Sequence, residues 1–116
     1  MNADIQELQT SLRAFAAERD WEQFHSPKNL ATAMSIEASE LLEHFQWLTD
    51  EQSRSLPDTK RDAIAEEVAD VFLYLLQLSD KLGIDPLDAA RKKLKLNAFK
   101  YPIERAKGTS KKYSDL

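Results

Sequence analysis

Apolar positions recur every three or four residues along most of this chain, which is the spacing of an amphipathic helix. No window shows convincing alternation of apolar and polar residues with β-branched side chains, so no strands are expected. The segments between the few prolines and glycines are rich in the helix formers Leu, Ala, Glu, Lys and Gln. The pattern therefore predicts an all-α fold.

Start and stop signals divide this pattern into four main helices. Ser26-Pro27 and Asp85-Pro86 each have the form of an N-cap followed by a proline at the first helical position. Gly83 has the form of a residue that follows a helix C-terminus. The four helices are predicted over residues 3–20, 27–48, 57–82 and 86–100.

The segments between the helices are expected to be irregular. Residues 21–25 have the character of a turn or a frayed helix end, and residues 49–56 have that of a polar loop. Residues 103–116 form a basic tail that is expected to be extended or mobile. With 116 residues, the chain is predicted to be one domain, residues 1–116, built as a helical bundle. Small helical chains often complete their core by oligomerisation, which is also expected here.

Composition narrows the function classes. Hydrophobic residues make up 42% and charged residues 31%, which is typical of a globular protein. The net charge of −4 gives no reason to expect nucleic-acid binding, and the absence of cysteine excludes disulfides, zinc thiolates and thiol nucleophiles. The first residues have neither the basic nor the apolar region of a signal peptide, and no apolar run approaches membrane-spanning length. A soluble cytoplasmic protein with no membrane partner is expected.

Two pairs of acidic residues are the main candidate chemistry. Glu37 and Glu40, and further along Glu67 and Asp70, are each spaced three residues apart, so each pair presents two carboxylates on one helix face. Two antiparallel helices joined by a short loop can bring such pairs face to face. Four carboxylates that meet repel one another unless a cation lies between them, and oxygen ligands favour Mg²⁺ or Mn²⁺. A site of this kind indicates chemistry on phosphates.

Each pair also has a simpler interpretation. Glu37 falls inside the apolar arc of its helix and Glu40 lies at the edge of that arc, so a structural salt bridge to lysine or arginine could neutralise them. The second pair lies on a polar stripe with Tyr74, Gln77 and Lys81, which for a lone helix is a solvated face. The match between the two pairs favours the metal site. The Glu-x-x-His signature of di-iron proteins is absent, which favours a hard cation over redox iron.

Aromatic residues and histidines are weaker candidates. Tyr74 could donate to a phosphate oxygen or be an ordinary surface tyrosine. Trp21 and Trp47 each stand just beyond a predicted helix end, where an indole ring could stack on a base or complete a core or an interface. For His25 and His44, a capping or packing role is favoured over catalysis. The sequence contains neither a glycine-rich phosphate loop nor a serine-triad signature.

The acidic pairs read together as Glu37-Ala38-Ser39-Glu40, a spacer, and Glu67-Val68-Ala69-Asp70. Further characteristic positions are residues 15–25, Phe45-Gln46-Trp47, Asn97, Tyr101-Pro102 and Lys112-Tyr113. With this motif and these flanks, nearly the whole chain resembles the MazG-like superfamily of all-α nucleoside triphosphate pyrophosphohydrolases, and most closely its dCTP pyrophosphatase branch. Leu12 and residues 31–35 differ from the relatives, so substrate preference has drifted if these positions line the base pocket.

The resemblance implies hydrolysis of a nucleoside triphosphate to the monophosphate and pyrophosphate, with dCTP or a modified dCTP as the substrate. Glu37, Glu40, Glu67 and Asp70 would hold Mg²⁺, or Mn²⁺, against the triphosphate. Glu37 or Glu40 would take a proton from the attacking water. The residues that would bind the substrate are Trp21, Trp47, Tyr74, Asn97, Lys100 and Tyr101.

The resemblance also implies a homotetramer, a dimer of dimers, with a house-cleaning role in the nucleotide pool. Two alternatives stay open. One is a pyrophosphohydrolase that prefers another nucleotide, such as dUTP. The other is a helical metal- or nucleotide-binding regulatory module without turnover.

Overall fold

A computed structural model describes residues 2–116, and these residues form helices, turns and loops with no strand. The all-α prediction is confirmed. The four long helices are α1 (Ala3–Glu18), α2 (Pro27–Glu43), α4 (Asp58–Leu82) and α5 (Pro86–Lys100). Three short helical segments, α3 (Asp50–Ser53), α6 (Ile103–Ala106) and a 3₁₀ turn at Glu22–Phe24, lie between or after them, and a second 3₁₀ turn covers Tyr113–Asp115.

Side-chain caps fix where the helices begin. The Asn2 carboxamide oxygen accepts bonds from the backbone N–H groups of Asp4 and Ile5 at the start of α1. The Ser26 hydroxyl accepts from the N–H of Asn29 at 3.1 Å, and Pro27 occupies the first turn of α2. These bonds satisfy N–H groups that have no partner within the helix, so the predicted starts at Ser26-Pro27 and Asp85-Pro86 are confirmed.

Three segments differ from their predictions. The second helix ends at Glu43 rather than Leu48, because the chain tightens there into turns such as the bond from Phe45 N–H to the Leu42 carbonyl at 2.8 Å. Residues 49–56 are not a plain loop, since α3 forms behind a reciprocal capping box between Thr49 and Gln52. The basic tail is likewise not wholly extended, because it contains α6 and the final 3₁₀ turn.

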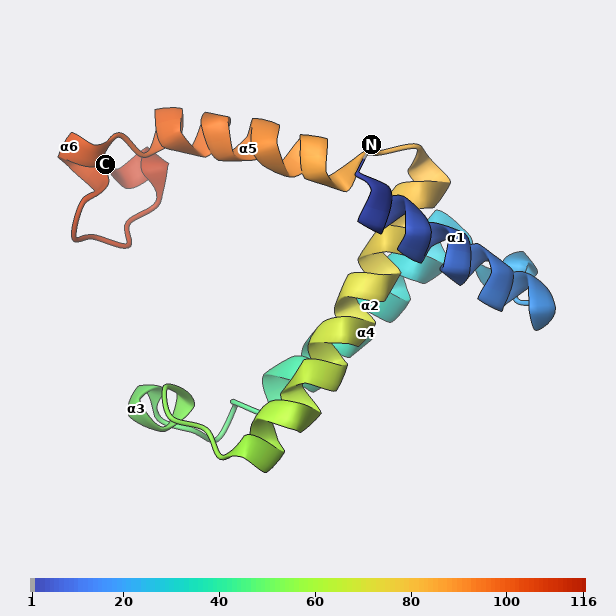
Figure 1. The fold of residues 1–116 in the computed structure, drawn as a ribbon. Helices are drawn as coiled ribbons and strands as arrows, with labels where there is room; N and C mark the ends of the chain where they lie inside the picture. Colours follow the sequence, from blue (N-terminus) through green and yellow to red (C-terminus); the bar gives the residue numbers. More distant parts are fainter. Residues whose placement is uncertain (1) are drawn as a thin grey trace. The chain divides into compact units, whose positions relative to one another are not determined.

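The described residues fall into two compact units, one ending at Ile84 and one covering Asp85–Leu116. In the first unit α2 and α4 lie side by side along most of α2, and α1 packs across α4 (Figure 1). The apolar core of this unit is small: its buried members are Ile5, Ala16, Leu30 and Leu76. Polar contacts reinforce the α1–α4 crossing. The Gln9 amide donates to the Leu76 carbonyl at 3.1 Å, and Arg13 forms a two-bond ion pair with Asp80.

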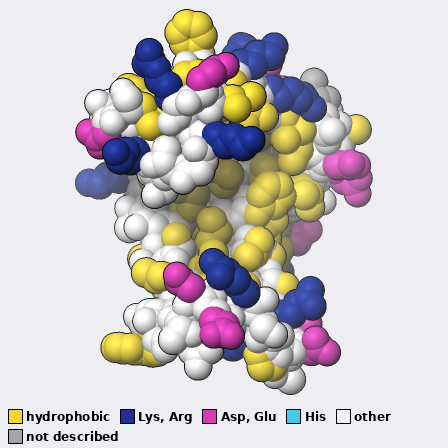
Figure 2. All heavy atoms as spheres, turned by 90° about the vertical axis from the view of Figure 1, so that its left-hand side faces the viewer, with side chains coloured by type: hydrophobic (Ala, Val, Ile, Leu, Met, Phe, Trp, Pro, Cys, Tyr) yellow, Lys and Arg dark blue, Asp and Glu magenta, His cyan; other side chains and the backbone are white. Residues whose placement is uncertain are grey.

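Many apolar side chains remain at the surface, among lysine, arginine and acidic side chains (Figure 2). Trp47 is 86% exposed, and in the second unit Leu94 is 70% and Phe99 89% exposed. Surfaces of this kind are typical of chains that bury them against a partner. Oligomerisation and the single domain over residues 1–116 stay predictions. No helix of residues 2–116 has the length and apolar character needed to cross a membrane.

The C-terminus of α4 depends on a backbone conformation that favours glycine. Gly83 has φ +65°, and the following Ile84 N–H bonds back to the Ser79 carbonyl at 2.9 Å. A Cβ built at Gly83 meets no atom within 4 Å, so an alanine there is strained by its backbone alone.

We therefore expect Gly83→Ala to lower the free energy of unfolding by about 1 kcal/mol. Urea unfolding followed by circular dichroism measures this difference. Gly83→Asn is the matched control, because asparagine tolerates the left-handed region and should lose less. Equal stability of the alanine variant and the original chain would contradict the role of this backbone conformation.

Candidate metal centre and adjoining cavity

The paired faces of α2 and α4 bring the acidic residues together. One carboxylate oxygen each from Glu37, Glu67 and Asp70 lies within 4.8 Å of the other two, an arrangement that offers oxygen ligands for one metal ion. Glu40 is the next acid along the same face of α2 and lies in hydrogen-bonding reach of Glu37. Glu37, Glu40 and Glu67 are half-buried, while Asp70 is exposed. Three of the four acids of the motif therefore converge, and Glu40 lies beside Glu37 outside that group of three.

Crowding of carboxylates changes the chemistry of Glu37. Its pKa is raised to about 7, first because Glu40 shares a hydrogen bond with the protonated form, and then because of desolvation, Glu67 and the charge of Asp70. In the absence of a cation, the cluster thus favours holding a proton at Glu37. A divalent cation would replace that proton and remove the repulsion.

Two carboxylate oxygens of the cluster are buried and lack a hydrogen-bond partner within residues 2–116, namely Oε2 of Glu37 and Oε2 of Glu67. Orphaned buried acceptors of this kind are uncommon in folded proteins. The ion pairs of the described chain join other residues: Arg13–Asp80, Arg19–Glu18, Lys81–Glu22 and Lys92–Asp88. The structural salt bridge considered for Glu37 and Glu40 is therefore not formed. The all-oxygen donor set and its two unpartnered oxygens fit a hard divalent cation.

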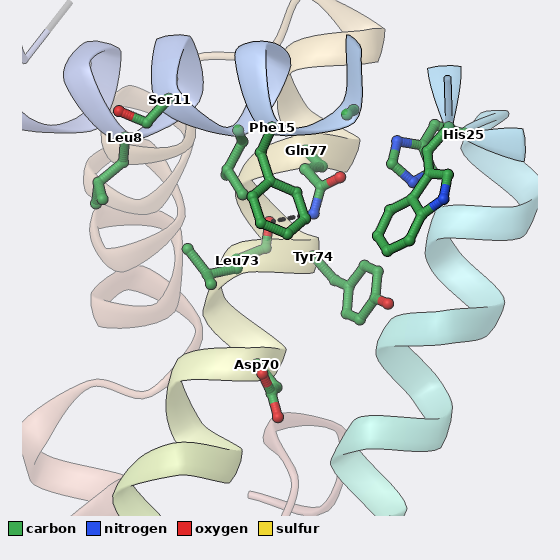
Figure 3. A pocket seen from close by; sticks show the side chains of 11 residues that line it. Leu8, Ser11, Phe15, His25, Asp70, Leu73, Tyr74 and Gln77 are labelled. Carbon is green, nitrogen blue, oxygen red and sulfur yellow. Dashed lines mark hydrogen bonds between the residues drawn. The ribbon is translucent and has the colours of Figure 1, made fainter. Parts of the chain in front are cut away.

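A cavity of about 410 Å³ adjoins the acidic cluster. Its walls come from α1, from α4 and from the segment between α1 and α2, and Asp70 belongs both to the cluster and to the cavity (Figure 3). Most lining side chains are apolar or aromatic: Leu8, Leu12, Phe15, Ala16, Trp21, Leu73 and Tyr74. This volume lies in the range of small-molecule sites, which are also mainly apolar.

The local fold of the α1 C-terminus places Trp21 in the cavity wall. Asp20 adopts φ +54°, and the Trp21 N–H returns to the Ala16 carbonyl at 2.9 Å while the Asp20 N–H bonds to Ala17, which closes the helix in a Schellman motif. The indole then meets the Phe15 ring edge to face at 5.8 Å between ring centres. Trp21 is 44% exposed, so part of its surface is open to a ligand.

The cavity also contains polar residues whose place the sequence did not predict. Ser11, His25 and Gln77 line it together with Asp70 and the Tyr74 ring. For His25 the sequence favoured capping or packing, and Gln77 was read only as part of a polar stripe. The one available signal was the spacing of Asp70, Tyr74 and Gln77 on successive turns of a single helix face.

Other predicted site residues lie elsewhere. Trp47 follows α2 and does not line the cavity. Asn97, Lys100 and Tyr101 belong to the second unit, where the Lys100 ammonium lies 4.8 Å from the centre of the Tyr113 ring and Tyr101 meets the same ring edge to face. Leu12 does line the cavity. The substrate-binding roles of these residues stay predictions.

Comparison with known proteins decides the family. The family model described as "MazG-like family" matches residues 32–116, which include both acidic pairs. The chain belongs to the MazG-like family. The resemblance seen in the sequence, including the branch, is confirmed by similarity to dCTP pyrophosphatase 1 of Mus musculus and of Homo sapiens, each 42% identical over 104 residues and 88% of this chain.

The chain spans about three fifths of those two MazG-like relatives, 61% of each. The chain is also similar to a solved structure, a pyrophosphatase from Archaeoglobus fulgidus, and matches more of that protein's length. It is 40% identical, superposes with a TM-score of 0.81, and the match covers 88% of this chain and 95% of the archaeal one.

Proposed function

We propose that the chain is a Mg²⁺-dependent nucleoside triphosphate pyrophosphohydrolase, with dCTP or a modified dCTP as its substrate. The observation that carries the proposal is the cluster of Glu37, Glu67 and Asp70, with two unpartnered buried oxygens, at the edge of a cavity of nucleoside size. The names of the relatives, dCTP pyrophosphatase 1 and a pyrophosphatase, support it.

In this proposal three of the four acids bind the metal ion and the fourth accepts a proton. Glu37, Glu67 and Asp70 hold the cation, because their oxygens already converge. Glu40, beside Glu37 but outside that group of three, is the better placed of the two glutamates to accept a proton from water attacking the α-phosphorus. Bound Mg²⁺ would supply neutralisation of phosphate charge and a more acidic water, and Mn²⁺ offers the same chemistry.

The cavity holds the nucleoside in this proposal. Trp21 and Phe15 offer aromatic surface to the base, and Tyr74 lines the cavity from a position on α4 between Asp70 and Gln77. Trp47, Asn97, Lys100 and Tyr101 are proposed to complete the substrate site. Trp47 and Lys100 are exposed, and Asn97 and Tyr101 are half-buried, so each keeps surface that a ligand or a second copy of the chain could contact.

We further propose a homotetramer, a dimer of dimers, working in the cytoplasm to clear unwanted nucleotides. The small apolar core and the many exposed apolar side chains support association. Light scattering tests this part by itself, and an active, stable species near the 13.3 kDa monomer mass would contradict it.

A nucleotide panel tests the reaction. We expect Mg²⁺-dependent conversion of dCTP or a 5-modified dCTP to monophosphate and pyrophosphate, followed by chromatography, and less turnover of dUTP. EDTA should abolish it and added Mg²⁺ should restore it. Nucleotide or metal binding without turnover of any triphosphate would favour the regulatory module instead.

A further inference from the structure

We propose that Gln77 makes the cavity selective for a base that carries an exocyclic amino group. The inference rests on the proposed function, since it concerns which nucleotide occupies the same site. Its basis is the hydrogen-bonding polarity of the cavity wall. Most of that wall is apolar, so the few polar groups within it must decide which base edge is accepted.

The carboxamide of Gln77 has one orientation that its own helix allows. Its Nε2 donates to the Leu73 carbonyl at 3.4 Å, one turn earlier on α4. If the amide were turned over, its oxygen would face the carbonyl oxygen of Leu73, and two acceptors would repel each other. No donor among residues 2–116 reaches the Gln77 oxygen, Oε1. The group therefore presents a free acceptor, and Figure 3 shows this oxygen turned away from the bond to Leu73.

The other polar groups that line the cavity can adapt. The hydroxyls of Ser11 and Tyr74 rotate and can either donate or accept, and neutral His25 can exchange its tautomer. Asp70 is engaged in the acidic cluster at the other end. Gln77 is therefore the cavity residue whose polarity is fixed by the fold, which gives it the power to reject a mismatched base.

The position of Gln77 along α4 suits contact with a base. Asp70, Tyr74 and Gln77 lie on one face of the helix, and the seven residues from Asp70 to Gln77 span roughly 10 Å of its length. That span is comparable with the reach of a nucleotide from its first phosphate to the edge of its base. With the phosphates held at Asp70, the base edge reaches the level of Gln77.

The hydrogen-bonding groups of the bases show which base Gln77 should prefer. Cytosine and adenine carry an amino donor beside a ring-nitrogen acceptor, whereas uracil and thymine carry a carbonyl beside a ring N–H. The Gln77 oxygen accepts from the amino group of the first class and opposes the carbonyl of the second. His25 also lines the cavity, and its imidazole can offer a donor to the ring nitrogen.

The test compares dCTP with dUTP, which differ at the amino or carbonyl group in question. We expect kcat/KM of the original chain to be at least tenfold higher for dCTP than for dUTP, a ratio of about the size expected for one hydrogen bond. With dCTP the Gln77 oxygen gains a hydrogen bond from the amino group, and with dUTP it faces the carbonyl and is repelled. Gln77→Met keeps the length of the side chain without the acceptor, so the preference should fall to near unity. Gln6→Met, on the exposed part of α1 outside the cavity, is the matched control.

A second readout separates this inference from the proposed reaction. Calorimetric binding of dCMP and dUMP reports base preference without turnover, and circular dichroism checks that each variant is folded. An unchanged dCTP-to-dUTP ratio in Gln77→Met, or a preference for uracil in the original chain, would overturn the role of Gln77 while leaving the reaction intact. Absent turnover with dCMP bound more tightly than dUMP would overturn the reaction and keep the inference. If neither monophosphate binds and no triphosphate is turned over, both fail.

Discussion

Glu67→Gln should reduce kcat on the order of a thousandfold while leaving the fold intact. The substitution removes one of the three converging carboxylates and leaves the rest of α4 unchanged. A neutral amide is a poorer ligand for Mg²⁺ and neutralises less of its charge, so metal affinity and activity should fall together. Glu67 is half-buried and one of its oxygens has no hydrogen-bond partner within residues 2–116. Removing the negative charge of this carboxylate therefore also relieves repulsion within the cluster. The metal-free variant should therefore unfold at a higher temperature than the original chain.

Glu66 provides a matched control for this result. It is the preceding residue of the same helix, an exposed glutamate outside the converging group, so Glu66→Gln changes the net charge equally. Pyrophosphate release, calorimetric Mg²⁺ binding and thermal unfolding should all stay near their original values in that control. A Glu67→Gln variant with near-normal turnover, or a Glu66→Gln variant that is equally damaged, would mean that the cluster is not the catalytic metal site.

The helices could be predicted from sequence because their signals are local. Ser26-Pro27, Asp85-Pro86 and Gly83 act through bonds to residues within one turn, and the structure has each of them in the expected role. The short helix α3 was missed because its capping box, Thr49 with Gln52, lies in a polar segment without an apolar stripe. Helix ends without a glycine, such as Glu43, gave no comparable stop signal.

Helix periodicity predicted the acidic cluster, but it did not predict the cavity beside it. The match between the acidic pair on the apolar arc of one helix and the acidic pair on the polar stripe of another was enough to expect Glu37 and Glu67 to meet. The cavity depends on how α1 crosses α4 and on the left-handed turn at Asp20, which aims Trp21. Neither feature follows from spacing along one helix, because both arise from packing between segments far apart in sequence. For the same reason Gln77 looked like a surface residue until the cavity was formed around it.

The raised pKa of Glu37 predicts opposite pH dependences for the metal-free and metal-bound protein. Folding raises this pKa from 4.5 to about 7, so the folded chain holds the proton more tightly than the unfolded chain. The stabilisation from Glu37 is therefore fully present below pH 4.5 and is lost as the pH rises through about 7. Glu37→Gln cannot titrate. The stability of the original chain relative to this variant should thus fall across that window when EDTA is present.

Metal binding should follow the reverse trend, because Mg²⁺ must displace the proton from Glu37. Below pH 7 we expect the fall in apparent Mg²⁺ affinity to approach about tenfold per pH unit, which amounts to about fiftyfold between pH 7 and pH 5. Isothermal calorimetry in buffers of different ionisation enthalpy measures both the affinity and the proton released. Near one proton should be released at pH 6 and almost none at pH 8.5. An affinity that is flat across this range, with no proton release, would show that the proton on Glu37 and the cation do not compete for one site.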